Sequence, residues 1–382
     1  MVTNDIRYIG VDDKTLDLFE SQYVVPNGVS YNSYVILDDK VAVMDTVDRR
    51  KTTEFLANLR QALAGRQPDY LVVQHMEPDH AASIQALVEQ YPDVQLVASA
   101  KALQMLPLYF TGLDLSRAVT VKEGDTLSLG RHELTFISAP MVHWPEVMMT
   151  YDKCDKVLFS ADGFGKFGAL DTDEAWDDEA RRYYFNIVGK YGPQVQSVLK
   201  KAAGLDIRAI CPLHGPVLKE DLGHYLDKYN IWSSYGVESE GVFIACASIH
   251  GNTAAAVDKL AEILRAKGCP KVAMADLTRD DMAEALEDAF RYGKVVLAAA
   301  SYNAGVMPAM EDFLHHLKGK NYQKRTVALV ENGSWAPTAA RTMREILGQA
   351  KDITVVEPAV TIRGALKDSD LPALEALAGA IL

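Results

Sequence analysis

The 382-residue sequence has few cysteines, no long apolar run and no excess of positive charge. Its four cysteines, Cys154, Cys211, Cys246 and Cys269, are scattered without a CxxC pair. This pattern argues against a disulfide framework or a cysteine-rich metal site and is typical of a reducing cytoplasm. No apolar stretch approaches the roughly 20 residues that a membrane helix needs, and the N-terminus lacks the basic start and apolar run of a signal peptide. We therefore expect a cytoplasmic protein without a membrane partner.

The charge is negative and unevenly distributed. With 39 Lys and Arg against 52 Asp and Glu, the formal net charge is −13, which makes nucleic acid an unfavourable partner. Residues 241–382 contain 16 basic and 17 acidic residues, so the remaining 23 basic and 35 acidic residues place 12 of these negative charges in residues 1–240. The composition changes near WSSYGVESEG at 232–241. We predict two domains, residues 1–240 and residues 241–382.

The second predicted domain alternates strands and helices. Short apolar runs predict buried parallel strands at 241–248, 271–277, 294–301 and 325–332, with a possible fifth strand at 352–360. Helical patterns lie between them at 253–267, 281–290, 308–318 and 337–349, and a final helix covers the C-terminus. Such alternation indicates a doubly wound parallel sheet, which binds its ligands at the carboxyl ends of the strands.

The first predicted domain has a mixed α+β pattern. Hairpins are expected at 31–46 and 125–139, and further strands at 69–74, 156–161 and 207–212. Helical patterns occur at 51–64, 81–90, 175–201 and 221–230. We expect a large layered domain with sheets inside and helices outside.

Metal-binding residue types follow several strands of this domain. The strand at 69–74 is followed by His75-Met76-Glu77-Pro78-Asp79-His80, and His143, Asp162 and His214 each come shortly after another apolar strand. If those strands are neighbours, all seven side chains converge on one edge of a sheet. Seven ligands without sulfur suit two ions that share a bridging carboxylate. Iron or manganese is favoured, and zinc stays open. The alternative is a polar loop that caps the helix at 81–90.

A second constellation, Ala-Ser-Ile-His-Gly-Asn-Thr at 247–253, joins the first strand and first helix of the second domain. Its donors and the helix start can hold a phosphate, and without Lys, Arg or a GxGxxG pattern a monophosphate such as that of FMN fits best. Two later strand ends would flank the flavin ring, with Tyr302 and Trp335 offering flat faces. The alternative is ordinary turn chemistry. The predicted cofactor-binding residues are Ser248, His250, Gly251, Asn252, Thr253, Ser301, Tyr302, Asn303, Ala304, Gly305, Asn332, Gly333, Ser334 and Trp335.

The combination of HxExDH, a later His, Asp and His, and a C-terminal doubly wound domain resembles the flavodiiron proteins (A-type flavoproteins). The resemblance extends to YNSYVI (31–36), HWPEVMMTYD (143–152), RRYYFNIVGKY (181–191) and CPLHG (211–215). It implies a metallo-β-lactamase-like αββα sandwich followed by a flavodoxin-like α/β domain with a doubly wound parallel sheet. It also implies reduction of dioxygen to water, of nitric oxide to nitrous oxide, or of both.

The same resemblance implies FMN and two iron ions. His75, Glu77, His143 and Asp162 would hold one iron, and Asp79, His80, Asp162 and His214 the other. Tyr183 and Tyr184 are candidates for hydrogen bonding near the gas site, with packing as the alternative. A head-to-tail homodimer or a dimer of dimers is implied, with Trp144 and Glu146 on the facing surface.

The electron donor would be a separate rubredoxin-type protein, an NADH-linked reductase or reduced deazaflavin, because the sequence has no CxxC…CxxC module. Two other functions stay open at this point: a two-metal zinc hydrolase of the same fold, and an electron carrier with a structural metal. His132, His224, His315 and His316 are predicted to be surface or helix residues.

Overall fold

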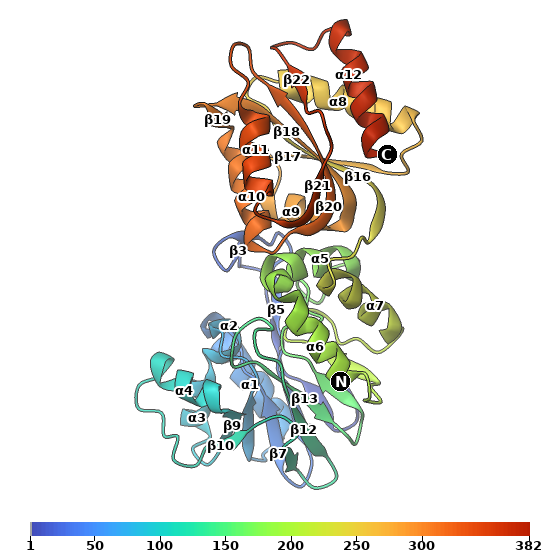
Figure 1. The fold of residues 1–382 in the computed structure, drawn as a ribbon. Coiled ribbons are helices and arrows are strands. Elements are labelled where there is room, and N and C mark those ends of the chain that lie inside the picture. Colours follow the sequence, from blue (N-terminus) through green and yellow to red (C-terminus); the bar gives the residue numbers. More distant parts are fainter. Residues whose placement is uncertain (1) are drawn as a thin grey trace. The chain divides into compact units, whose positions relative to one another are not determined.

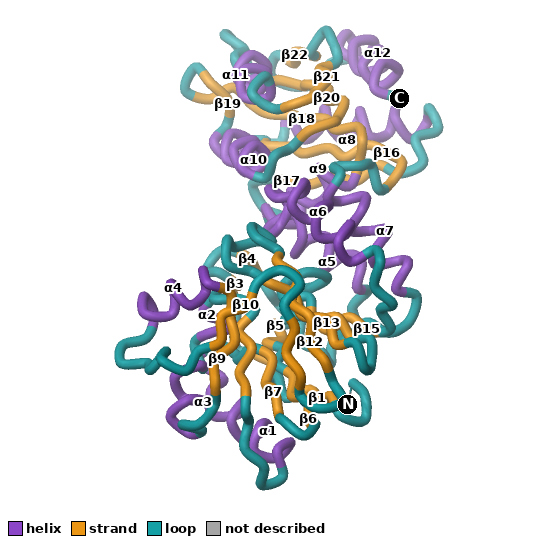
Figure 2. Tube along the Cα trace, turned by 60° about the horizontal axis from the view of Figure 1, so that its bottom comes forward, coloured by secondary structure: helices purple, strands orange, loops and turns teal. Residues whose placement is uncertain are grey.

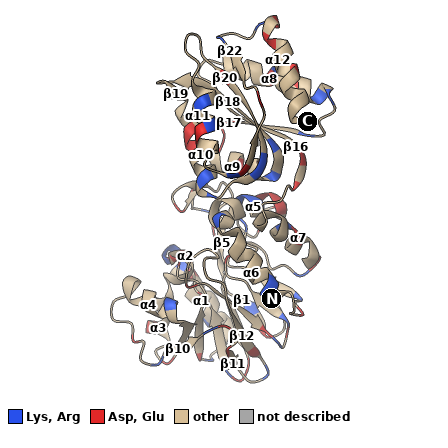
Figure 3. Cartoon of the chain, viewed as in Figure 1, with Lys and Arg blue, Asp and Glu red and all other residues tan. Residues whose placement is uncertain are grey.

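The computed structural model describes residues 2–382 as two compact units (Figure 1). The first unit extends to Tyr184 and includes Pro193–Asn230, and the second consists of Phe185–Gly192 and Ile231–Leu382. In both units strands form the interior and helices the exterior (Figure 2). Figure 3 marks where the Lys, Arg, Asp and Glu residues lie along the chain. Among the described helices, none is both long and apolar enough to cross a membrane.

The first unit contains two sheets with a shared core. The six-stranded sheet has the order β1 (Ile6–Tyr8), β6 (Tyr34–Leu37), β7 (Val41–Met44), β8 (Tyr70–Val73), β9 (Gln95–Ser99) and β10 (Val119–Val121). The five-stranded sheet has the order β11 (Thr126–Ser128), β12 (Glu133–Ser138), β13 (Met148–Asp152), β14 (Val157–Phe159) and β15 (Ala209–Cys211). Apolar side chains of both sheets, such as Val72 and Phe136, form one buried cluster between them. Two short pairs, β2 (Val11–Asp13) with β5 (Val29–Tyr31) and β3 (Leu18–Phe19) with β4 (Tyr23–Val24), lie outside these sheets.

Seven helices accompany these sheets: α1 (Thr52–Leu63), α2 (Pro78–Ala81), α3 (Ile84–Gln90), α4 (Ala100–Tyr109), α5 (Trp176–Tyr183), α6 (Gly192–Ala202) and α7 (Leu222–Ser233). Both predicted hairpins form, with β6 antiparallel to β7 and β11 antiparallel to β12. The helical pattern at 175–201 is wrong as a single helix, because a π-helical turn at Tyr184–Val188 and a 3-10 turn at Gly189–Tyr191 separate α5 from α6. The predicted layered α+β sandwich is confirmed.

The second unit is built on one parallel sheet. Its main path has the order β17 (Val272–Asp276), β16 (Ser239–Ala247), β18 (Tyr292–Tyr302), β20 (Gln323–Asn332) and β21 (Lys351–Val355), all pairing in parallel. The order 2-1-3-4-5 is that of flavodoxin-like folds. Two short strands are attached at the side, β19 (Gly305–Val306) on β18 and β22 (Val360–Ile362) on β20. The predicted strand at 352–360 is therefore two strands, β21 and β22.

Helices cover this sheet. They are α8 (Asn252–Ala266), α9 (Met282–Arg291), α10 (Pro308–Gly319), α11 (Ala339–Leu347) and α12 (Leu371–Ile381). α8 and α12 pack together over one buried cluster, which includes Leu260, Val296 and Leu377, while α10 contacts α9 and α11 (Figure 1). The continuous apolar strands are covered on both faces, as the sequence predicts for a doubly wound parallel sheet.

Candidate functional site

Four strand ends of the first unit bring the seven predicted ligands together. His75, Glu77, Asp79 and His80 follow β8, His143 follows β12, Asp162 follows β14, and His214 follows β15. The expectation of one sheet edge is wrong in this respect, since β8 belongs to the six-stranded sheet and the other three strands to the five-stranded sheet. β12, β14 and β15 run in one direction because β13, which the sequence analysis did not identify, lies antiparallel between β12 and β14.

The seven side chains form two adjoining groups. His75, Glu77, His143 and Asp162 make one, and Asp79, His80 and His214 make the other; within each group the ligand atoms lie within 4.8 Å of one another. In the first group, Glu77 Oε2 lies 3.3 Å from His75 Nε2 and 3.0 Å from His143 Nε2. In the second, Asp79 Oδ2 lies 3.3 Å from His80 Nε2 and 3.2 Å from His214 Nε2.

Asp162 lies between the two groups. Its Oδ2 is 3.3 Å from His75 Nε2 and 3.2 Å from His143 Nε2, while its Oδ1 is 3.2 Å from His80 Nε2 and 4.0 Å from His214 Nε2. Each oxygen of one carboxylate thus faces a different group, as a bridging ligand requires. The carboxylate oxygens of Asp162 and Asp79 are buried and accept no hydrogen bond from the described residues. Buried carboxylates without donors are costly, and cations would compensate them.

Neighbouring groups orient the imidazoles. Glu146 Oε1 lies 2.9 Å from His75 Nδ1 and also accepts a hydrogen bond from the Met76 N–H at 2.8 Å. The Ser30 carbonyl oxygen lies 2.7 Å from His214 Nδ1. Acceptors at both Nδ1 atoms favour the tautomers that leave Nε2 free for a cation.

Electrostatics couple these groups strongly. Burial by itself lowers the pKa of His143, but the carboxylates of Asp162 and Glu77 outweigh it and raise the pKa to about 9. Burial likewise opposes ionisation of Asp162, yet His75, His143 and His80 hold its pKa well below the usual range. In the absence of metal the positive charge would therefore be carried by protons on the histidines, and a metal ion would replace them.

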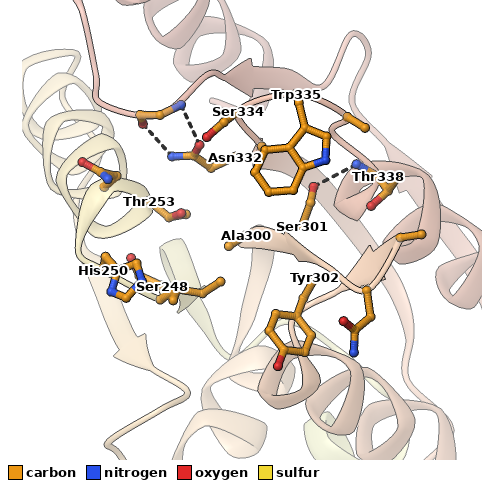
Figure 4. A pocket seen from close by; sticks show the side chains of 17 residues that line it. Ser248, His250, Thr253, Ala300, Ser301, Tyr302, Asn332, Ser334, Trp335 and Thr338 are labelled. Atoms are coloured by element: carbon orange, nitrogen blue, oxygen red, sulfur yellow. Dashed lines mark hydrogen bonds between the residues drawn. The ribbon is translucent and has the colours of Figure 1, made fainter.

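The second unit contains a cavity of about 460 Å³ at the carboxyl ends of its strands. Its wall includes every predicted cofactor-binding residue except Gly251 and Gly305, together with Ile249, Ala300, Ala336, Thr338 and Gly364. Among the described residues, no Lys, Arg, Asp or Glu lines it. Figure 4 shows Ser248, His250 and Thr253 at one end of the cavity, away from the rings of Tyr302 and Trp335.

The loop before α8 leaves room for a ligand. Gly251 has φ +86°, and a Cβ added there would meet no atom within 4 Å. Ser248 Oγ accepts hydrogen bonds from the Gly251 and Ala254 N–H groups, at 3.1 and 3.3 Å. On the opposite wall, Ser301 Oγ accepts the Thr338 N–H (Figure 4). Trp335 is 89% exposed and Tyr302 46%, so both rings could cover a flat ligand without leaving a packed core.

The chain is similar to several known proteins. Residues 29–215 match the family model described as ODP family beta lactamase. The chain is 29% identical over 380 residues to the nitric oxide reductase of Moorella thermoacetica, covering 97% of this chain and 94% of that protein. Among solved structures it resembles rubredoxin oxygen:oxidoreductase from the anaerobe Desulfovibrio gigas, with 26% identity, a TM-score of 0.91 and coverage of 100% of this chain and 97% of that one.

The flavodiiron protein from Giardia intestinalis is similar as well, with 25% identity, a TM-score of 0.92 and coverage of 99% and 94%. Over nearly its whole length this chain is thus similar to a flavodiiron protein and to proteins named as a nitric oxide reductase and an oxygen oxidoreductase. The hydrolase alternative is therefore not favoured. Both expected fold types, the metallo-β-lactamase-like sandwich and the flavodoxin-like sheet, are confirmed.

The two tyrosines have different surroundings. Tyr183 is fully buried, its ring centroid lies 5.4 Å from that of His214, and its hydroxyl has no hydrogen-bond partner among the described residues. Burial and the charges of Asp162, Asp79 and Glu77 hold its pKa well above the usual range, so the hydroxyl keeps its proton. The ring of Tyr184 packs against Tyr229.

Three residues of the first unit differ from the sequence prediction or were absent from it. Glu146 is buried beside His75 and not on a surface. His132 is fully buried, with Nδ1 3.0 Å from Asp152, and forms a further group with Cys154 and Asp155. Asp45 was missed, although it too ends a strand: it accepts the backbone N–H and side-chain amide of Gln74, and burial raises its pKa to about 6.

Proposed function

We propose that the protein reduces dioxygen to water, nitric oxide to nitrous oxide, or both, at two iron ions bound by His75, Glu77, Asp79, His80, His143, Asp162 and His214. The single observation that carries this proposal is the carboxylate of Asp162, whose two oxygens face two separate ligand groups. Nitrogen and oxygen ligands in near-equal number, without sulfur, suit iron. When bound, the iron pair would supply the redox chemistry and FMN the electrons.

The residues around the metals have distinct parts in this scheme. Asp162 would bind both ions, and Glu146 and the Ser30 carbonyl would fix the tautomers of His75 and His214. The buried hydroxyl of Tyr183, which has no partner among the described residues, would be able to donate a hydrogen bond near the metals. Tyr184 stays a prediction, with packing against Tyr229 as its alternative.

FMN is proposed for the cavity of the second unit. The α8 loop, with Ser248, Asn252 and Thr253, would hold the phosphate through hydroxyl, amide and backbone N–H groups. Tyr302 and Trp335 would flank the isoalloxazine ring. We also retain residues 1–240 and 241–382 as the metal and flavin domains, a head-to-tail homodimer or dimer of dimers, a separate electron donor and a cytoplasmic location as parts of this proposal.

A purified sample tests the proposal directly. We expect a yellow flavin spectrum and two irons per chain, and anaerobically reduced protein should consume dioxygen or nitric oxide in a single turnover. Running both gases in parallel, with product analysis, separates the two activities. Zinc in place of iron, with no flavin, would refute the proposal.

A further inference from the structure

An apolar groove of about 390 Å³ lies between α6 and α7 on the first unit. On α6, Val195, Val198, Leu199 and Ala202 recur at helical spacing and turn inward, which is the apolar stripe of an amphipathic helix. Behind the groove is an inner cavity whose facing surface is wholly apolar. Leu199, Ala202, Ile207 and Leu226 line both spaces, so the two spaces adjoin at these four side chains.

The inner cavity reaches the backbone of the metal cluster. Its wall includes Val142, directly before His143, and Gly163 and Phe164, directly after Asp162. Tyr229 is the one polar side chain on this wall, and its hydroxyl accepts the N–H of Phe164. The apolar space therefore extends from the surface groove to residues that adjoin two of the proposed iron ligands in the sequence, His143 and Asp162.

The size of the inner cavity suits a diatomic guest. About 20 Å³ is open to the centre of a water-sized molecule, and about 10–15 Å³ of such space suffices for one. Because water needs polar partners, an apolar space of this kind stays dry and takes apolar guests.

The metal cluster also has a polar approach of a different character. A depression of about 230 Å³ is lined by the charged side chains of Glu20, Asp48, Arg50, Glu77 and Asp79, together with Leu16, Leu18, Phe19, Ser21, Tyr31 and Pro78. Its charged side chains hold water and favour proton transfer, which the apolar surface of the inner cavity does not.

We propose that the α6–α7 groove and the inner cavity form the access route of the diatomic gas to the metal cluster, separate from the charged depression that carries water and protons. Rotamer changes of Leu199 and Leu226 open the wall between groove and cavity, on the time scale of side-chain motion. The route rests on the proposed function, because it assumes that a gas is the substrate.

Xenon binding tests the route without any chemistry. Crystals of the holoprotein under xenon pressure should show a xenon atom bounded by Val142, Val198 and Leu226. An inner cavity without xenon, or xenon only in the charged depression, would count against the route.

A matched pair of substitutions tests its use. Ala202 lines both spaces, whereas Ser197 is exposed on the same helix and lines neither. Ala202→Phe should lower the second-order rate constant of the reduced protein with gas about tenfold, equivalent to about 1.4 kcal/mol, while Ser197→Phe leaves it unchanged. Iron content and the rate of flavin reduction should match the wild type in both. If Ala202→Phe does not fold, Ala202→Leu is used and a smaller decrease in the same direction is expected.

Failure of the proposed function and failure of the gas route give different results. If wild-type protein reduces neither gas, the proposed function is wrong and the route falls with it. If wild-type protein reduces a gas but Ala202→Phe reacts at the wild-type rate, only the route is wrong.

Discussion

The two units form their sites from different kinds of side chain. The metal cluster of the first unit consists of charged, buried side chains from the ends of two sheets, held by further buried groups such as Glu146 and Asp45. The cavity of the second unit is uncharged and open, and it lies at the carboxyl ends of a single parallel sheet. The charged side chains of the first site interact strongly with protons and metal ions. The second site would hold its ligand through shape, stacking and hydrogen bonds.

The largest expected effect comes from the shared carboxylate. Asp162→Asn keeps the volume but removes the charge between the two groups, so we expect loss of the iron pair and at least a thousandfold decrease in gas turnover, roughly the scale of removing a central catalytic group. Iron analysis and single-turnover kinetics measure this. Asp276→Asn, at an exposed strand end of the second unit, is the control and should retain wild-type iron. Wild-type iron content in Asp162→Asn would contradict the bridging role.

Removing the support of His75 should have the next largest effect. Glu146→Gln retains an acceptor but loses the charge opposite Nδ1, and we expect metal affinity to fall about tenfold to a hundredfold. Competition with a chelator measures the affinity. Glu133→Gln, on the exposed part of β12, provides the matched control. An unchanged affinity in Glu146→Gln would mean that the carboxylate only fills space.

Metal uptake should depend on pH. In the metal-free protein the pKa of His143 is raised to about 9. The imidazole must be neutral to bind metal, so a proton on His143 competes with the metal ion. Below this pKa the apparent metal affinity falls about tenfold for each unit by which the pH is lowered. Affinity should therefore rise from pH 7 towards pH 9. Calorimetry in buffers of different ionisation enthalpy counts the released protons, and metal uptake without proton release would show that the histidines are neutral beforehand.

In the second unit the effect of a single residue should be smaller. Trp335→Ala removes an exposed stacking face and should weaken FMN binding about tenfold, which corresponds to an aromatic contact of about 1.4 kcal/mol. Because the ring is not part of the core, the thermal stability of the protein without flavin should not change. Trp335→Phe, which retains a flat ring, should lie between the two. Equal FMN affinity in all three proteins would place the flavin ring elsewhere.

The smallest expected effect is that of salt concentration on FMN affinity. No Lys or Arg lines the flavin cavity, so an FMN phosphate would be held by neutral donors and its affinity should change little with ionic strength. Titrations of FMN at low and high salt measure this. A steep loss of affinity with salt would reveal a cation that reaches the phosphate.

The same contrast decides what could be predicted from the sequence. The flavin cavity follows from one rule, that ligands bind at the carboxyl ends of parallel strands, so Ser248, Ser301 and Asn332 could be placed together from their strands alone. The metal ligands could be predicted because four of them lie close together between His75 and His80 and the others follow predicted strands.

Other features could not be predicted because they depend on packing between distant segments. Glu146 is three residues from His143, yet only the fold brings it against His75 on another sheet. The unpredicted strand β13, with its buried MMTYD sequence, is what sets β12 parallel to β14. The π-helical turn at Tyr184–Val188 contains no proline or glycine, although Gly189, Gly192 and Pro193 follow it directly and mark the start of α6.

The central claim is that one carboxylate, Asp162, joins two metal ions in the first unit. Mössbauer spectroscopy of protein loaded with ⁵⁷Fe tests it most directly. The account predicts two iron sites per chain whose spins are coupled, and loss of that coupling in Asp162→Asn. A single uncoupled iron in the wild-type protein would contradict it.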